Sequence, residues 1–179
     1  MQVVIAFAGR KGHGKDYCAH IVSEKYGAKR VSFADPIKEM AGNVFFWDGN
    51  KDKKGRKFLQ LLGTEVGRCY NERIWIDKAL DKMRKHDMVV NTDLRFNHEA
   101  EALEELDRKV VVIRVEKLDG WRMKWDKFKW VFKCKLGLEH SSEKGIDEKY
   151  IDYVVYNDFR APEKTIETVN KIVEDILND

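Results

Sequence analysis

Short runs of apolar residues alternate along the chain with longer segments whose apolar positions recur at helical spacing. Five apolar runs, rich in β-branched and aromatic residues, predict strands at residues 3–8, 29–34, 88–92, 109–115 and 153–156. Because these runs lack the alternation of a half-exposed strand, we expect both of their faces to be covered. The helical patterns predict helices at residues 15–26, 36–46, 56–70, 73–86, 97–106 and 162–177.

The alternation of strands and helices indicates the class of fold. It predicts right-handed crossovers and a parallel sheet, so we expect an α/β doubly wound domain. The 179 residues suit a single domain, residues 1–179, without a Pro/Gly/Ser-rich linker. Residues 47–55 are polar and predict a loop, and residues 117–145 form a long insertion typical of a lid or a small helical excursion.

Composition excludes several classes of protein. With 43% apolar residues the chain can bury a core, and 2 prolines and 12 glycines argue against collagen-like or low-complexity classes. Three scattered cysteines suit a reducing cytoplasm better than a disulfide framework or a zinc site. The N-terminal apolar run is too short for a signal peptide, and no run approaches the ~20 residues of a membrane span. We therefore expect a soluble cytoplasmic protein.

The first chemical motif is a glycine-rich loop between the first predicted strand and the first predicted helix. Gly9-Arg10-Lys11-Gly12-His13-Gly14-Lys15-Asp16 matches the P-loop (Walker A) pattern G-x-x-x-x-G-K, with Asp16 where Ser or Thr is usual. Its glycines let backbone N–H groups curl around phosphates, and the helix dipole adds positive potential. We expect residues 9–17, through Tyr17, to bind ATP, with Lys15 on the β- and γ-phosphates and Asp16 on Mg²⁺.

A second candidate site lies on the predicted helix 56–70. Arg56, Gln60, Gly63 and Thr64 stand at i, i+4, i+7 and i+8, and so share one face of a helix ending near Gly63. A cation, an amide and a hydroxyl in one row suit a phosphorylated nucleoside, and equally suit a solvated polar face.

A third candidate follows the third predicted strand, where Asp93 and Arg95 stand two residues apart. Ligands of open α/β sheets gather at the carboxyl ends of strands. The pair therefore suits a substrate and its phosphate, with a local salt bridge as the alternative. Asn97 suits the N-cap of the next helix.

Taken in order, these motifs resemble those of the deoxynucleoside monophosphate kinases of tailed phages, a branch of the P-loop kinases. The matching stretches are residues 9–16, 33–38, 56–64, 92–96 and 140–143, the last being His-Ser-Ser-Glu. The Gly-Lys-Asp ending of the loop is a mark of this branch. The chain departs from the pattern at Tyr17, commonly Thr, and at Phe159, where Gly often follows the Asn-Asp of the adenine loop.

The resemblance implies a three-layer P-loop NTPase fold, like that of nucleoside monophosphate kinases, with a five-stranded parallel sheet and a lid at residues 117–145. It implies transfer of the γ-phosphate of ATP, with Mg²⁺, to a deoxynucleoside monophosphate, in the host cytoplasm if the chain is phage-encoded. By position it implies an acceptor site made of Lys38, Arg56, Lys57, Gln60, Gly63, Thr64, Trp75, Asp93, Arg95 and Glu99.

Individual roles follow from that resemblance and from the chemistry of phosphoryl transfer. Arg95 and Arg56 would neutralise the acceptor phosphate, since guanidinium groups match phosphate oxygens in pairs. Asp93 would orient the acceptor or hold Mg²⁺ through water. Trp75 would pack beside the acceptor, and Lys38 would touch phosphate.

The insertion carries the excess positive charge of the chain. The whole sequence has a net charge of +3, whereas residues 117–135 hold seven cations and two anions, interleaved with five aromatic residues. A closing lid would bring such cations to the phosphates, with Arg122 and Lys129 as candidates and Arg122 assigned a catalytic role. The same composition suits stacking on single-stranded nucleic acid, which is the less favoured partner.

Two alternatives to the deoxynucleotide kinase stay open. Animal-type phosphomevalonate kinases share the architecture, the Gly-Lys-Asp loop and the Asp–Arg motif, although Leu-Gln-x-x-Gly-Thr-Glu at residues 59–65 favours the nucleotide kinase. The alternative of a different class is a non-catalytic P-loop protein that binds nucleotide or nucleic acid. Base preference and homodimer formation stay open as well.

Overall fold

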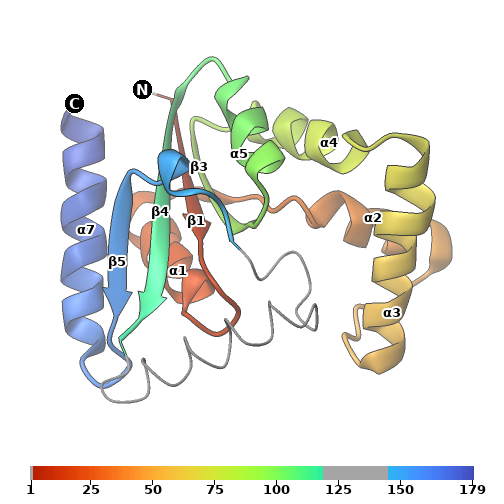
Figure 1. Cartoon of the computed structure of the whole chain (residues 1–179), viewed down its shortest axis with the longest axis horizontal. Helices are drawn as coiled ribbons and strands as arrows, with labels where there is room; N and C mark the ends of the chain where they lie inside the picture. Colours follow the sequence, from red (N-terminus) through yellow and green to blue (C-terminus); the bar gives the residue numbers. More distant parts are fainter. Residues whose placement is uncertain (1, 119–144) are drawn as a thin grey trace.

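The computed structural model describes residues 2–118 and 145–179. Five parallel strands form one sheet in the order β2-β3-β1-β4-β5 (Figure 1). The strands are β1 (Val3–Ala8), β2 (Lys29–Arg30), β3 (Met88–Leu94), β4 (Lys109–Lys117) and β5 (Tyr153–Asn157). The helices are α1 (Lys15–Tyr26), α2 (Asp35–Phe45), α3 (Lys53–Leu61), α4 (Ile74–Met83), α5 (Asn97–Glu104) and α7 (Pro162–Asn178). The predicted α/β fold with a five-stranded parallel sheet is confirmed.

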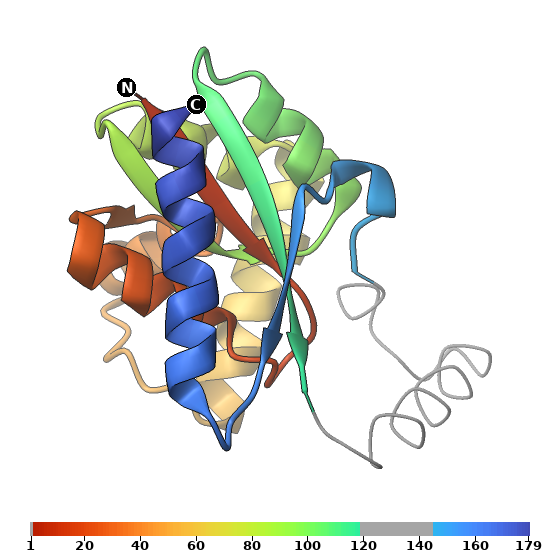
Figure 2. The ribbon, with the colours of Figure 1, turned by 90° about the vertical axis from the view of Figure 1, so that its left-hand side faces the viewer.

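Helices cover both faces of the sheet, which gives three layers. Every residue of β1 is buried, and its side chains alternate between two cores. The odd-numbered residues of β1 pack with α1 and α7, and the even-numbered residues pack with α4 and α5. Figure 2 shows α7 in front of the sheet and α5 behind it. Burial on both sides explains the continuous apolar pattern of the strand.

The second strand is shorter than predicted. β2 covers Lys29–Arg30, although the apolar pattern continues to residue 34. The N–H of Val31 still reaches the carbonyl of Val90 at 3.0 Å, but the N–H groups of Phe33 and Ala34 bond to the carboxylate of Asp93. Because that side chain replaces a strand partner, the chain leaves the sheet there and starts α2 at Asp35.

The segment after α2 also differs from the prediction. The polar stretch 47–55 does not stay a loop to its end, because Asp52 caps α3 by accepting a hydrogen bond from Gly55 N at 2.7 Å. The predicted helix 56–70 is helical but is not one regular α-helix, because α3 ends at Leu61, near Gly63. It continues as a π-helical turn, η1 (Leu62–Arg68), directly after α3.

The predicted insertion lies between β4 and β5 in the sequence. β4 runs to Lys117, and the N–H of Leu118 donates to the carbonyl of Asn157 at 2.9 Å. The chain is described again from Gly145, just before the short helix η3 (Glu148–Tyr150). Within the described residues, no helix is both long and apolar enough to cross a membrane.

Candidate active site

Strand register brings the phosphate loop next to the Asp93–Arg95 segment. Ala8, the last residue of β1, pairs with Leu94 on one side and Arg114 on the other. Gly9 therefore begins the loop beside the point where Arg95 leaves β3. Two of the three candidate sites thus meet at the carboxyl edge of the sheet, the usual place for ligands in an open α/β fold.

The loop between β1 and α1 has the backbone conformation that its glycines allow. Gly9, Gly12 and Gly14 have φ values of 132°, 81° and 94°, a region that side-chain-bearing residues rarely adopt. The Lys15 ammonium donates to the carbonyls of Gly9 and Arg10 at 2.7 and 2.9 Å. The loop therefore curls around the lysine, and Lys15 is buried at 9% exposure.

The loop is braced from the far end of the sheet by Asn157, in the predicted adenine loop, and by Thr165, which the sequence did not single out. Asn157 at the end of β5 is 1% exposed and donates its amide to the His13 carbonyl at 3.0 Å. A Cβ on Gly14 would stand 2.0 Å from that amide nitrogen. Thr165 of α7 donates to the other side of the Asn157 amide at 3.2 Å. The Asn157-Asp158 pair could have signalled this role, since a polar residue ends an otherwise apolar strand.

His13 also packs against β4. Its Nδ1 lies 3.2 Å from the Val115 carbonyl and 4.0 Å from a Glu116 carboxylate oxygen. Burial lowers the pKa of the imidazole, outweighing the hydrogen bond to Val115 and the charge of Glu116. His13 is therefore neutral near pH 7, and the loop contributes its backbone and lysine rather than a histidine charge.

Asp16, the predicted Mg²⁺ ligand, lies at the start of α1 and is largely exposed. It accepts a hydrogen bond from Nη2 of Arg30 at 2.9 Å, in an ion pair with β2. The residues that the structure describes contain no group of three or more His, Cys, Asp or Glu arranged to hold a metal ion. Kinase sites hold Mg²⁺ with one or two carboxylates and the substrate phosphates, so Asp16 fits this donor set once Arg30 releases it.

Asp93 uses its carboxylate inside the protein. One oxygen accepts from the Phe33 N–H at 2.9 Å and the Asn91 amide at 3.1 Å, and the other accepts from the Ala34 N–H at 3.0 Å. Asp93 therefore fixes the connection from β2 to α2, a task that its position in the sequence did not reveal. Its predicted roles toward the acceptor or Mg²⁺ stay predictions.

Glu99 and Arg95 lie together at the turn from β3 into α5. The buried Glu99 carboxylate accepts from the N–H groups of Arg95 and Phe96 at 2.8 and 3.1 Å, and the Arg95 side chain is exposed. The sequence predicted Asn97 as the N-cap of α5, and this prediction is wrong. Asn97 is instead the first residue of the helix. The N-cap position falls one residue earlier, on Phe96, and the Asn97 side chain exchanges two hydrogen bonds with Asp147.

The predicted acceptor row on α3 lies apart from this edge in the described contacts. Arg56 donates to the Lys51 carbonyl at 2.7 Å, and Lys57, Gln60 and Thr64 are exposed. Figure 1 shows α3 beyond α2, away from the strand ends. Lys38 forms an ion pair with Asp35 at 2.7 Å, within the first turn of α2. Strand register thus brings the end of β3 beside the loop, whereas no contact described for Arg56 of α3 reaches that edge.

Gly63 and Trp75 belong to the packing of η1. The Trp75 indole is 2% exposed and donates to the Gly63 carbonyl at 2.8 Å. A Cβ on Gly63 would stand 3.0 Å from Ile37 of α2, and a Cβ on Gly67 would stand 2.2 Å from the Trp75 ring. Trp75 therefore holds η1 against α4, and its predicted place beside the acceptor stays a prediction.

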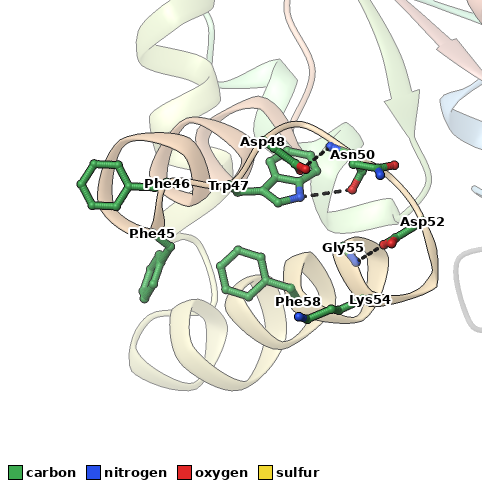
Figure 3. A pocket seen from close by; sticks show the side chains of 9 residues that line it. All are labelled: Phe45, Phe46, Trp47, Asp48, Asn50, Asp52, Lys54, Gly55 and Phe58. Carbon is green, nitrogen blue, oxygen red and sulfur yellow. Dashed lines mark hydrogen bonds between the residues drawn. The ribbon is translucent and has the colours of Figure 1, made fainter.

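A separate hollow of about 480 Å³ lies between the end of α2 and α3 (Figure 3). Phe45 and Phe58 meet edge to face there, with ring centroids 5.4 Å apart, and the Trp47 indole donates to the Asn50 carbonyl. Phe58 and the row that contains Arg56 and Gln60 lie on opposite faces of α3. The hollow is therefore not part of the predicted acceptor row.

Several predicted residues lie outside the described part of the chain. They are Arg122, Lys129, the rest of the basic and aromatic run after residue 118, and residues 140–143. Lys117, at the start of the run, lies at the end of β4 with its ammonium 5.6 Å from the centre of the Phe159 ring.

Comparisons with known proteins bear on the identity of the fold. The chain is 36% identical over 110 residues to the deoxynucleoside-5'-monophosphate kinase of Escherichia phage T5, a match covering 58% of this chain and 39% of that protein. It is 28% identical over 142 residues to an Acanthamoeba polyphaga mimivirus protein named as a deoxynucleotide monophosphate kinase, covering 62% of this chain and 73% of that protein. The chain therefore spans less than half of the phage relative, and it matches no protein-family model.

Solved structures agree on the architecture. The shikimate kinase of Acinetobacter baumannii, solved with shikimate, superposes with a TM-score of 0.51 at 14% identity, covering 99% of this chain and 94% of that one. At this identity the likeness establishes the fold alone. The chain therefore has the fold of the P-loop kinases, and in sequence it resembles the deoxynucleotide monophosphate kinases of phage T5 and mimivirus.

Proposed function

We propose that the chain is an ATP-dependent deoxynucleoside monophosphate kinase, which converts a deoxynucleoside monophosphate and ATP to the diphosphate and ADP. One observation carries the proposal: the pairing of Ala8 with Leu94, which sets a P-loop beside an exposed arginine. A donor phosphate on the loop and an acceptor phosphate at Arg95 would then lie at the same sheet edge. The names of the phage and mimivirus relatives support the nucleotide as acceptor.

On the donor side, the chain supplies a ready cradle of backbone N–H groups. Gly14 directly precedes α1, so the free N–H groups of the first helical turn face the β- and γ-phosphates. The Lys15 ammonium, now on the Gly9 and Arg10 carbonyls, would move a short way onto the phosphates. In exchange for two neutral carbonyls it would gain charged oxygens, which are the stronger hydrogen-bond acceptors.

On the acceptor side, phosphoryl transfer needs alignment and charge neutralisation more than covalent help. An oxygen of the acceptor phosphate forms the new bond to the γ-phosphorus, while the bond to the β,γ-bridging oxygen breaks and its electrons leave with ADP. The acceptor oxygen is already ionised, so no general base is required. The Arg95 guanidinium would hold the acceptor phosphate in a bidentate contact.

Magnesium would be held by Asp16 together with the donor phosphates. When bound, it neutralises charge on the transferring group. Arg122, in the predicted lid, is proposed as a further cation on that group. The remaining acceptor residues Arg56, Lys57, Gln60 and Thr64 would reach the nucleotide if α3 moves toward the sheet edge, as acceptor modules of kinases do on closure.

The test is an ATP-consumption screen of the purified chain against the four deoxynucleoside monophosphates, the four ribonucleotides and phosphomevalonate. We expect ADP formation that depends on a deoxynucleoside monophosphate and on Mg²⁺. Turnover with phosphomevalonate alone would instead identify the related small-molecule kinase. ATP binding that no acceptor converts to turnover would indicate a non-catalytic nucleotide-binding protein, and salt-sensitive binding of single-stranded DNA without turnover would indicate a nucleic-acid protein.

A further inference from the structure

The two oxygens of the Glu99 carboxylate face different parts of the protein. Oε2 accepts both backbone hydrogen bonds of the β3–α5 turn, from Arg95 N and Phe96 N. Oε1 instead faces η1, where Nη2 of Arg68 lies 4.0 Å away. One side chain therefore shapes the turn that carries Arg95 and also faces a second arginine on a different element.

Arg68 is held at this edge by two contacts. Its guanidinium lies over the ring of Phe96, 5.6 Å from the centroid, in addition to its ion pair with Glu99. Its side chain is 36% exposed, whereas that of Glu99 is 4% exposed. The arginine thus keeps a solvent-facing side over Phe96, the residue that follows Arg95, while its partner carboxylate is buried.

The surroundings of Glu99 are mixed in charge. Asp93 from β3 is a nearby like charge, Arg68 from η1 is the opposite charge, and His98 stacks on Phe96 at 5.3 Å. Burial raises the pKa of the Glu99 carboxyl to about 7, against the opposing effect of its two backbone hydrogen bonds and Arg68. Near neutral pH the carboxyl therefore exchanges between its charged and neutral forms.

We propose that Glu99 is a positioning residue for Arg68, and that Arg68 is a second guanidinium on the acceptor phosphate beside Arg95. The proposal rests on the proposed kinase function and deepens its acceptor site. Two arginines on separate elements, one on the β3–α5 turn and one on η1, would clamp the acceptor phosphate from two sides. Glu99 ties those elements together, because it accepts the backbone hydrogen bonds of the turn and pairs with Arg68 of η1.

Glu99→Gln separates the two tasks of this side chain. The amide oxygen can take the place of Oε2 and keep both backbone hydrogen bonds, as Gln does in a capping box. The amide nitrogen would then face Arg68, so the ion pair is lost without loss of the turn. The matched control is Glu105→Gln, at the end of the same helix, where the carboxylate is exposed and pairs only with Arg73 among the contacts described.

The experiment measures KM and kcat for the preferred deoxynucleoside monophosphate in the whole chain. We expect Arg68→Met to raise the acceptor KM about 10- to 150-fold, as loss of one hydrogen bond between charged groups does, and Glu99→Gln to raise it by a smaller factor. The KM for ATP stays within twofold of wild type. The double variant should be no worse than Arg68→Met, since both changes remove the same interaction.

A pH series gives a readout that loss of stability would not produce. Between pH 6.5 and 8 the phosphate of the substrate titrates in the same way for every variant. Dividing the KM of Glu99→Gln by that of wild type therefore removes the effect of substrate ionisation. We expect that ratio to grow with pH as Glu99 ionises in the wild type. The KM ratio of Arg68→Met to wild type should also grow with pH, whereas the KM ratio of Glu105→Gln to wild type should stay constant.

Two results would overturn the proposal while leaving the kinase function intact. One is an acceptor KM of Arg68→Met equal to that of the control in an enzyme active on deoxynucleoside monophosphates. The other is equal losses in ATP and acceptor KM, which would show a general loosening of the fold. A wild-type chain without such turnover would instead refute the proposed function.

Discussion

The indole nitrogen of Trp75 donates to the carbonyl of Gly63 at 2.8 Å, and the ring occupies the space that a Cβ on Gly67 would need. This contact holds the π-helical turn η1 in place, since a wider turn leaves backbone carbonyls that ordinary helical bonds do not satisfy. The region predicted to bind the acceptor is therefore built on a buried tryptophan and two glycines four residues apart.

We expect Gly67→Ala to destabilise the chain by about 1–3 kcal/mol, because a Cβ 2.2 Å from the indole overpacks the site. Urea unfolding of the purified variant measures this change. Gly42→Ala is the matched control, because its Cβ would have its nearest neighbour at 4.0 Å, inside a regular helix. That control should be neutral or slightly stabilising, and equal stabilities of the two variants would contradict the packing described.

Lys15→Ala should lower the ATP turnover of the chain by at least about two orders of magnitude, by loss of charge stabilisation on the transferring phosphate. The fold should persist, since the hydrogen bonds of the lysine to the Gly9 and Arg10 carbonyls lie within the loop itself. Steady-state ADP release together with circular dichroism measures both effects. Lys25→Ala, on the exposed end of the same helix, is the control expected to keep full activity. Normal turnover by Lys15→Ala would exclude the loop from the mechanism.

Arg95→Ala should mainly weaken use of the acceptor. The exposed guanidinium has no structural partner among the described contacts, so its loss leaves the fold intact. A charge-assisted contact of about 1.5–3 kcal/mol corresponds to a rise of roughly 10- to 150-fold in the acceptor KM. Initial-rate measurements at saturating ATP test this. An unchanged acceptor KM with a raised ATP KM would assign Arg95 to the donor instead.

Arg30→Met should make the chain respond to lower concentrations of Mg²⁺. In the structure Arg30 pairs with Asp16, the proposed ligand, and an ion has to displace it. An exposed pair contributes about 0.2–1 kcal/mol, so the half-saturating Mg²⁺ concentration should fall by about 1.5- to fivefold. A Mg²⁺ titration of turnover measures this shift. A half-saturating concentration identical to that of wild type would argue against Asp16 as a ligand.

The stability of the chain should depend on the ionisation of Glu99. The buried carboxyl has a pKa of about 7 in the folded chain against an ordinary 4.5, so its contribution is full below pH 4.5 and is lost as pH rises through 7. The loss approaches about 3 kcal/mol as an upper bound. Glu99→Gln does not ionise, so its stability relative to wild type should be greater at pH 8 than at pH 5. Urea unfolding at both values tests this, and a difference independent of pH would contradict it.

The pattern of apolar residues predicted the bounds of those strands and helices whose ends are marked by nearby residues, such as glycines. β1 and α1 have the predicted bounds because an apolar run meets a glycine loop, and because Gly27, at φ 68°, ends the helix. Such caps depend on residues a few positions apart, so the sequence shows them directly.

The features that the sequence did not predict depend on contacts between residues far apart in the chain. β2 ends early because Asp93, about sixty positions away, binds the backbone of Phe33 and Ala34. The π-helical turn is bonded to Trp75 of α4, and Asn97, one residue past the N-cap of α5, binds Asp147. The three candidate motifs were visible in the sequence, but only strand register shows that two of them share an edge.

The contact between Asn157 and the His13 carbonyl has a consequence for the order of synthesis. The glycines of the phosphate loop precede Asn157 and Thr165, the residues that brace the loop, along the chain and are therefore synthesised before them. A nascent chain that ends before β5 carries the whole loop without its brace. The loop is therefore braced only after β5 and α7 have left the ribosome, and fragments that end before β5 should bind ATP poorly.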